Sequence, residues 1–266
     1  MRKKERTPGL VTETFLNESP VTIAGSLLAG MILPAAASVS LSVALGGRDV
    51  SALGLILIAS GTMAAYGLDR LIDQRECDSQ QVRRSFLICV VLASLVAGVL
   101  ACTTWWRFQV CSVLGIIAGG YVPLKRYIPK NILTTTAWTT ATATLPFASQ
   151  PPLDPLFAAS VLTVSLIVLA NTILCDIPDF ESDQQSGVLG ITPRFGPRAG
   201  AIAAITWSCL GVIVASIAGR WGLALTSLGL GVLAMLALKR PDQRHFRLLA
   251  DVLVTILPGP LALFFR

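Results

Sequence analysis

The chain of 266 residues is 53% hydrophobic and only 14% charged, with a mean hydropathy of +0.70 and a formal net charge of +6. A soluble domain carries about a quarter charged residues, so this composition excludes an ordinary soluble fold. The basic residues lie in short connections between apolar runs, a placement typical of membrane topology signals and not of nucleic-acid binding. We therefore predict an all-α, polytopic membrane protein that does not bind nucleic acid.

Nine apolar runs follow one another along the chain, and each is close to the roughly 20 residues that cross a bilayer as a helix. The fifth run is rich in threonine, whose hydroxyl can bond to the backbone of its own helix, so we keep it as a span. We expect a cytosolic segment over 1–20 and a single nine-helix domain over 21–266. The expected spans are 21–46, 51–68, 86–104, 108–124, 131–149, 155–175, 199–219, 221–238 and 248–265.

The distribution of Lys and Arg predicts the orientation, because basic connections stay in the cytosol. If the N-terminus is cytosolic, 17 of the 21 basic residues fall on the cytosolic side, in 1–20, 69–85, 125–130, 176–198 and 239–247. The connections on the other side are short and hold three of the remaining four, Arg48, Arg107 and Arg220, and the fourth is the terminal Arg266. We expect the functional residues at the cytosolic face, where the long charged connections lie.

An acidic cluster follows the second expected span. Asp69, Asp73 and Glu76 are spaced so that a helix continued for one or two turns carries them on one face. Carboxylates stacked in this way repel one another, and the C-terminus of a helix is already negative. A compensating cation is therefore expected at this position.

A second acidic cluster follows the sixth expected span. Asp176, Asp179 and Asp183 are spaced i, i+3, i+7 and share one helical face, with Pro178 marking a helix start or kink between them. Magnesium compensates such clusters well, because it prefers carboxylate oxygens and bridges to phosphate oxygens. Two facing clusters with Mg²⁺ would clamp a diphosphate. The alternative is that these acids are solvated groups at helix ends.

Other polar side chains can complete such a clamp. Lys125 and Arg126 follow the fourth span, and Arg194 follows the second cluster. Each would contact diphosphate oxygens, or else serve as a topology signal or a lipid headgroup contact. Asn171, inside the sixth span, either faces the substrate or bonds to a neighbouring helix. We expect Asp251 to form an ion pair with the basic loop that precedes it.

The stretch from Asp176 to Gly196 resembles the second aspartate motif of the UbiA superfamily of intramembrane prenyltransferases. It reads Asp-x-x-Asp-x-x-x-Asp, has Gly187 four residues later, and closes with Thr-Pro-Arg-Phe-Gly. The pair Asp69-x-x-x-Asp73 resembles the last half of the family's first motif. The segment Tyr121 to Arg126 is similar to the family's Y-x-x-x-K-R segment after the fourth helix. With motifs after spans two and six, the resemblance covers essentially the whole chain.

The resemblance implies a bundle of helices around a central cavity that is capped by the two aspartate motifs on the cytosolic side. A polyprenyl diphosphate would bind there with Mg²⁺, its tail among membrane lipids, and its prenyl group would pass to a small hydrophobic or aromatic acceptor. The implied metal ligands are Asp69, Asp73, Asp176, Asp179 and Asp183, and all of these except Asp176 are implied to be catalytic. The implied substrate-binding residues are Tyr66, Lys125, Arg126, Asn171, Asp176 and Arg194.

The head of the first motif departs from the family pattern, because Ala65 and Tyr66 stand where the family has Asn and often Asp. Water or Glu76 would then complete the first metal site. This departure leaves an alternative open, a degenerate member that binds a prenyl diphosphate or acts as a scaffold without turnover. A CDP-alcohol phosphotransferase fits less well, since it needs one continuous aspartate run. A transporter also fits less well, since its charges would lie near the membrane midplane.

Overall fold

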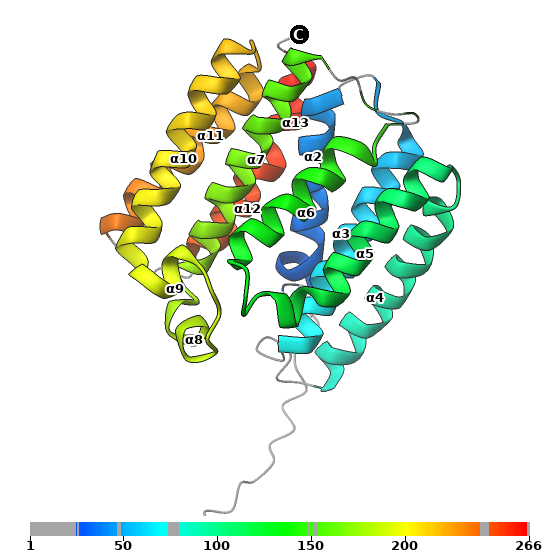
Figure 1. Cartoon of the computed structure of the whole chain (residues 1–266), viewed down its shortest axis with the longest axis horizontal. Helices are drawn as coiled ribbons and strands as arrows, with labels where there is room; N and C mark the ends of the chain where they lie inside the picture. The colour runs from blue at the N-terminus through cyan, green and yellow to red at the C-terminus, as the bar shows by residue number, and fades with distance from the viewer. Residues whose placement is uncertain are drawn as a thin grey trace, which may run out of the picture.

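The helices of the chain pack side by side into one bundle (Figure 1). The computed structural model describes residues 25, 27–46, 49–73, 80–147, 149, 151, 154–239 and 245–264. Within these ranges the only β-type pairing is an isolated bridge between Val50 and Phe147, so the all-α prediction is confirmed. The helices are η1 (a π-helix, Leu28–Ile32), α2 (Leu33–Gly46), α3 (Ala52–Asp73), α4 (Gln80–Ala101), α5 (Trp105–Leu124), α6 (Lys130–Thr144), α7 (Pro155–Asp176), α8 (Phe180–Gln185), α9 (Ile191–Phe195), α10 (Pro197–Ile217), α11 (Trp221–Lys239), α12 (His245–Ile256) and α13 (Pro258–Phe264).

Six helical segments in the described part of the chain are long and apolar enough to cross a membrane. They are 52–72, 80–101, 155–176, 197–217, 221–239 and 246–264. Each overlaps one of the expected spans, so the protein is an integral, multi-pass membrane protein. The expected count of nine is not established: the apolar helix at 30–46 is shorter, and α6 has only 15 residues.

Helix α7 lies at the centre of the bundle, between α6, α10, α11 and α12 (Figure 1). Its sequence is apolar on every side, which is typical of a helix surrounded by protein, and Val164, Ile167 and Ile173 are fully buried. Helix α4 behaves differently, because Leu95 is 61% and Val99 is 71% exposed. Large apolar side chains left uncovered on a membrane helix are suited to contact with lipid.

Two hydroxyl groups of the threonine-rich helix α6 bond to the backbone of their own helix as the sequence predicts, whereas those of Thr135 and Thr139 are buried without a hydrogen-bond partner among the described residues. Thr142 Oγ1 donates to the backbone oxygen of Trp138 over 2.9 Å, and Thr144 Oγ1 donates to that of Thr140 over 2.6 Å. The indole Nε1 of Trp138 donates to Ser38 Oγ on α2. These bonds let a polar sequence form a helix that is packed against its neighbours.

The last expected span is broken between α12 and α13 by Pro258. Proline has no N–H and its ring clashes with the preceding turn, so the helix is interrupted at Leu257. The N–H of Gly259 donates to Ser40 Oγ on α2 over 2.9 Å. A backbone group is thus satisfied by a neighbouring helix, as a span inside lipid requires.

Candidate functional site

The two acidic clusters lie at the same end of the bundle. Helix α3, which carries Asp69, and helix α7, which ends at Asp176, both run to the end of the bundle opposite α13 (Figure 1). Tyr121, in the last turns of α5, interacts electrostatically with both Asp69 and Asp176. The phenol of Tyr121 therefore senses the charge of both clusters.

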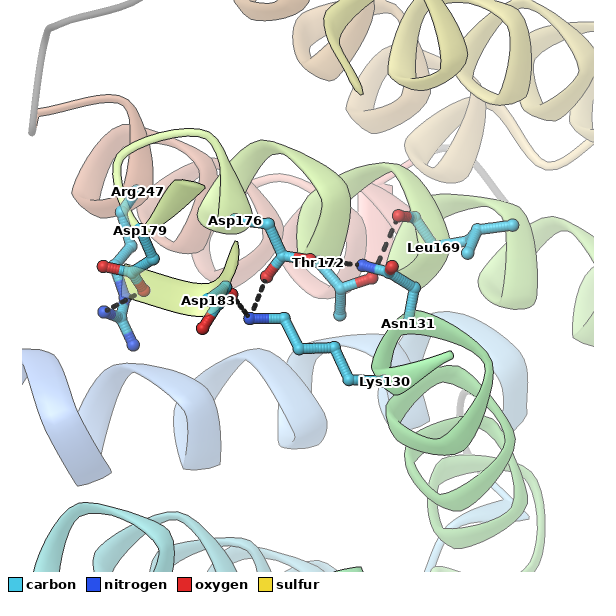
Figure 2. A network of polar contacts seen from close by, with 8 residues as sticks. All are labelled: Lys130, Asn131, Leu169, Thr172, Asp176, Asp179, Asp183 and Arg247. Atoms are coloured by element: carbon cyan, nitrogen blue, oxygen red, sulfur yellow. Dashed lines mark hydrogen bonds and ion pairs between the residues drawn. The ribbon is translucent and has the colours of Figure 1, made fainter. Parts of the chain in front are cut away.

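The second cluster is built around the ammonium group of Lys130, the first residue of α6 (Figure 2). Its Nζ lies 2.7 Å from Asp176 Oδ1 and donates a short hydrogen bond to Asp183 Oδ2. The other carboxylate oxygen of Asp176 accepts a hydrogen bond of 2.7 Å from Asn131 Nδ2. The start of α6 thus supplies an ammonium and an amide to carboxylates from α7 and α8.

The loop after α8 holds the backbone of Lys130 in place. Gly187 ends α8 with a φ of 68°, a left-handed conformation that favours glycine and turns the chain back toward α6. Leu189 then donates its N–H to the oxygen of Lys125 over 3.2 Å. In return, the oxygen of Leu189 accepts a hydrogen bond of 2.9 Å from the N–H of Lys130. Glycine at position 187 therefore lets the chain turn after Asp183 and return to the start of α6.

The prediction that Asp176, Asp179 and Asp183 share one helical face is wrong. Helix α7 ends at Asp176, and α8 begins only after Asp179, because Pro178 interrupts the chain between them. Asp176 and Asp183 still converge, but on Lys130. Asp179 instead lies 3.7 Å from Arg247 Nη1 on α12, with 40% of its side chain exposed (Figure 2).

Burial and charge act in opposite directions on Lys130. Burial alone lowers the pKa of its ammonium, while the attraction of Asp176 and Asp183 and their hydrogen bonds raise it. The balance raises the pKa above its ordinary value of 10.5. Lys130 therefore keeps its positive charge throughout the physiological pH range.

The first cluster is described only in part. The side chain of Asp69 is half-buried on α3, whereas the side chain of Asp73 and the whole of Glu76 lie outside the described parts of the chain. Tyr66 packs its ring edge-on against Trp138 of α6, with centroids 5.7 Å apart. The residue that departs from the family pattern therefore serves as a contact between α3 and α6.

Asn171 bonds to a neighbouring helix, one of the two roles expected for it. Its Nδ2 donates to Asp251 Oδ1 on α12 over 3.1 Å, and Cys175 Sγ lies 3.9 Å from the same oxygen. The expected ion pair between Asp251 and the preceding basic loop is replaced by this buried contact, because α12 turns Asp251 inward toward α7. The Oδ1 of Asn171 is buried and accepts no hydrogen bond from the described residues.

Of the three basic residues predicted to bind diphosphate, Lys125 and Arg126 follow the end of α5 and Arg194 lies in α9. The ammonium of Lys125 lies 5.7 Å from the centre of the Tyr121 ring, and Arg126 is exposed. Arg194 is also exposed and lies over the ring of Phe195, 5.3 Å from its centre. Such positions leave long cationic side chains able to reach an anion at the membrane surface.

The donor set of the second cluster fits Mg²⁺ in kind. Its oxygens are carboxylates, which Mg²⁺ prefers, and Asp176 and Asp183 already converge on one cation, the ammonium of Lys130. Among the described residues, no three His, Cys, Asp or Glu side chains lie close enough together to hold a metal ion. Magnesium usually keeps several waters and takes phosphate oxygens, so two protein ligands are compatible with it.

The residues that face the acids are not evident from the sequence. Lys130 falls among the basic topology signals and Asn131 and Arg247 belong to no motif, yet each contacts an aspartate of the second cluster. One signal was present, since Lys130 and Asn131 are polar residues at the start of an expected span. Their partners lie at least 45 residues away in sequence, so the contacts themselves could not be seen there.

Comparison of sequences identifies no relative: no protein-family model matches the chain, and no curated protein does. Comparison of structures does. A UbiA homologue from Aeropyrum pernix K1 matches with a TM-score of 0.61 at 17% identity, over 87% of this chain and 96% of its own.

Two further solved structures match over nearly the same length. A UbiA homologue from Archaeoglobus fulgidus bound to GPP and Mg²⁺ has a TM-score of 0.59 at 14% identity, covering 90% of this chain and 99% of its own. A digeranylgeranylglyceryl phosphate synthase has a TM-score of 0.56 at 12% identity, covering 91% and 97%. The chain therefore has the fold of the UbiA superfamily.

Proposed function

We propose that this protein transfers a prenyl group from its diphosphate to an acceptor inside the membrane, in a reaction that depends on Mg²⁺. The observation that carries the proposal is the convergence of the carboxylates of Asp176 and Asp183, with the ammonium of Lys130, at the end of a bundle with the UbiA fold where the acidic helix α3 also ends (Figure 1). The same fold binds GPP and Mg²⁺ in the homologue from Archaeoglobus fulgidus. The enzyme class is a prenyltransferase.

In this proposal the diphosphate lies between the two acidic clusters. When bound, Mg²⁺ neutralises the charge that develops on the departing diphosphate. The proposed metal ligands come from Asp69 and Asp73 of the first cluster and from the aspartates of the second. Lys125, Arg126 and Arg194 would contact diphosphate oxygens.

The reaction breaks the bond between the first prenyl carbon and the diphosphate oxygen, and the electron pair leaves with diphosphate. An electron pair of the acceptor then forms the new bond to that carbon, and the acceptor loses a proton. The apolar interior around α7 would keep water from capturing the allylic cation. Tyr66 and Asn171 would line the interior side of the site. We infer a small hydrophobic or aromatic acceptor, such as a quinone precursor.

We also propose the orientation that the basic residues favour, with segment 1–20 and both acidic clusters at the cytosolic face. The acidic end would then meet water-soluble Mg²⁺ and diphosphate product directly. The prenyl tail would extend toward the lipid-facing surface of the bundle.

A second candidate function is prenyl-diphosphate binding without turnover. It is favoured by one observation, that Ala65 and Tyr66 replace polar residues at the head of the first motif and that Tyr66 packs against Trp138. In this case the protein would act as a carrier or scaffold.

The test measures both binding and chemistry. The purified protein in lipid nanodiscs is titrated with geranyl diphosphate at millimolar Mg²⁺, and lipid extracts of cells with and without the protein are compared by mass spectrometry. Prenyl transfer predicts Mg²⁺-dependent binding and a prenylated lipid found only in cells with the protein. If geranyl diphosphate binds but the two lipid extracts are identical, the second candidate is favoured. If geranyl diphosphate does not bind with any divalent metal ion present, both candidates are contradicted.

A further inference from the structure

The second acidic cluster carries its own cation. Lys130 Nζ lies 2.7 Å from Asp176 Oδ1 and even closer to Asp183 Oδ2, the position from which one ion would compensate both carboxylates (Figure 2). The second oxygen of Asp176 is occupied as well, by Asn131 Nδ2 at 2.7 Å. A metal ion that bound both carboxylates would have to take the place of the ammonium group.

The lysine is held in this position by its surroundings. Its side chain is 16% exposed, and the side chains of Asp176 and Asp183 are 7% and 6% exposed. Its backbone N–H is bonded to Leu189 O, so the start of α6 cannot move away without breaking the contact to the loop after α8. A metal ion that displaced the ammonium would leave Lys130 without its two carboxylate partners, and a largely buried charge without a partner is strongly unfavourable.

The third acid of the cluster also faces a basic side chain. Asp179 lies 3.7 Å from Arg247 Nη1, an ion pair in which both side chains are more exposed than those around Lys130. Among the described residues, Lys130 and Arg247 thus lie against the three carboxylates of the cluster. Asp176 and Asp183 are buried and make the short contacts, whereas the side chain of Asp179 is 40% exposed.

We propose that Lys130 is a resident cation that takes the place of a metal ion between Asp176 and Asp183 and presents its charge to the diphosphate. Resting on the proposed function, this removes Asp176 and Asp183 from the proposed Mg²⁺ ligands and makes Lys130 a further substrate-binding residue. The site then needs one metal ion fewer, because the ammonium of Lys130 already compensates the carboxylates of Asp176 and Asp183. The raised pKa of Lys130 is consistent with this role, because it keeps the charge in place.

Metal counting tests the proposal directly. Mn²⁺, a paramagnetic substitute for Mg²⁺, is titrated into the full-length protein in nanodiscs with and without geranyl diphosphate, and bound ions are counted by electron paramagnetic resonance. Replacing Lys130 with methionine keeps the length of the side chain but exposes the carboxylate pair. Lys130→Met should therefore bind about one more Mn²⁺ per chain than the wild type.

Three variants control the result. Lys239→Met removes the same charge at the C-terminal end of α11 and should bind as many Mn²⁺ ions as the wild type. Lys130→Arg keeps the charge and should also keep the wild-type count. Adding Asp176→Asn to Lys130→Met should abolish the extra site. An unchanged count in Lys130→Met would overturn the proposal, as would an extra ion that survives Asp176→Asn.

If Lys130→Met does not fold, a measurement on the wild type tests the proposal instead. An amine-reactive reagent is applied with and without millimolar Mg²⁺, and labelling at Lys130 and Lys239 is compared by mass spectrometry. Lys130 should stay protected in both conditions. Labelling that rises with Mg²⁺ alone would show that metal displaces the lysine and would overturn the proposal. Because this comparison needs no prenyl diphosphate, it decides the role of Lys130 even if the wild type fails to bind geranyl diphosphate, the result that contradicts the proposed function.

Discussion

Replacing Lys130 with methionine should destabilise the folded protein strongly. The substitution leaves the carboxylates of Asp176 and Asp183 buried at 7% and 6% exposure without the ammonium between them. Removing one partner of a buried ion pair typically costs about 3–5 kcal/mol. Since about 1.4 kcal/mol is a tenfold change, the folding equilibrium constant should fall by at least a hundredfold.

The ionisation of Lys130 should not change the size of this loss of stability between pH 6 and pH 9. Its pKa is raised by the two carboxylates above the ordinary 10.5, so its stabilising contribution is complete below that value. The contribution is lost only as the pH rises through the still higher folded value. Across the accessible range the ammonium stays charged.

A double-mutant cycle separates the ion pair from general damage. Asp183→Asn leaves Lys130 with Asp176, so it should cost less than Lys130→Met, about 1.5–3 kcal/mol. The double variant should show a coupling energy of about 0.5–3 kcal/mol between the two residues. Reversible unfolding in mixed micelles with rising dodecyl sulfate measures these values. Lys239→Met is the matched control and should stay within about 0.5 kcal/mol of the wild type.

A Lys130→Met protein as stable as the Lys239→Met control would contradict this prediction. So would a cycle without coupling, because the side chains of Lys130 and Asp183 are in direct contact. Either result would mean that the ammonium does not lie between the carboxylates in the membrane.

Two further predictions concern contacts that support the site. Asp251→Ala leaves the buried Nδ2 of Asn171 without its acceptor and should cost about 1–3 kcal/mol, seen as a lower Tm in detergent; an unchanged Tm would argue against the bond. Gly67→Ala places a Cβ 2.5 Å from Val90 Cγ2 and should cost about 1–3 kcal/mol through overpacking of α3 on α4. The control Gly98→Ala meets open space and should not lower the Tm, so equal losses in both variants would contradict the packing explanation.

The sequence predicts the membrane architecture well because the physical signal is local. A span needs a run of apolar residues, and each long helix found here overlaps such a run. Even α6 follows this logic, since Thr142 and Thr144 bond to their own helix as expected. The break at Pro258 is equally local in cause, but nothing in the sequence identified Ser40 as the partner of the next N–H.

The site is predicted less completely because its contacts join distant segments. The positions of Asp176 and Asp183 near a cation follow from their mutual repulsion. The identity of that cation does not, because Lys130 reaches them through the packing of α6 against α7. The same limit applies to Asp251, whose partner depends on the rotation of α12 and not on the charges next to it in sequence.

Release of diphosphate is the decisive measurement for prenyl transfer that depends on Mg²⁺. Wild-type protein in nanodiscs is incubated with geranyl diphosphate and a membrane lipid extract that supplies acceptors, and free diphosphate is measured with and without Mg²⁺. Prenyl transfer at this site predicts release that requires Mg²⁺, stops when EDTA is added, and falls at least about a hundredfold in Asp69→Asn. Release that is independent of Mg²⁺, or that survives unchanged in Asp69→Asn, would contradict it.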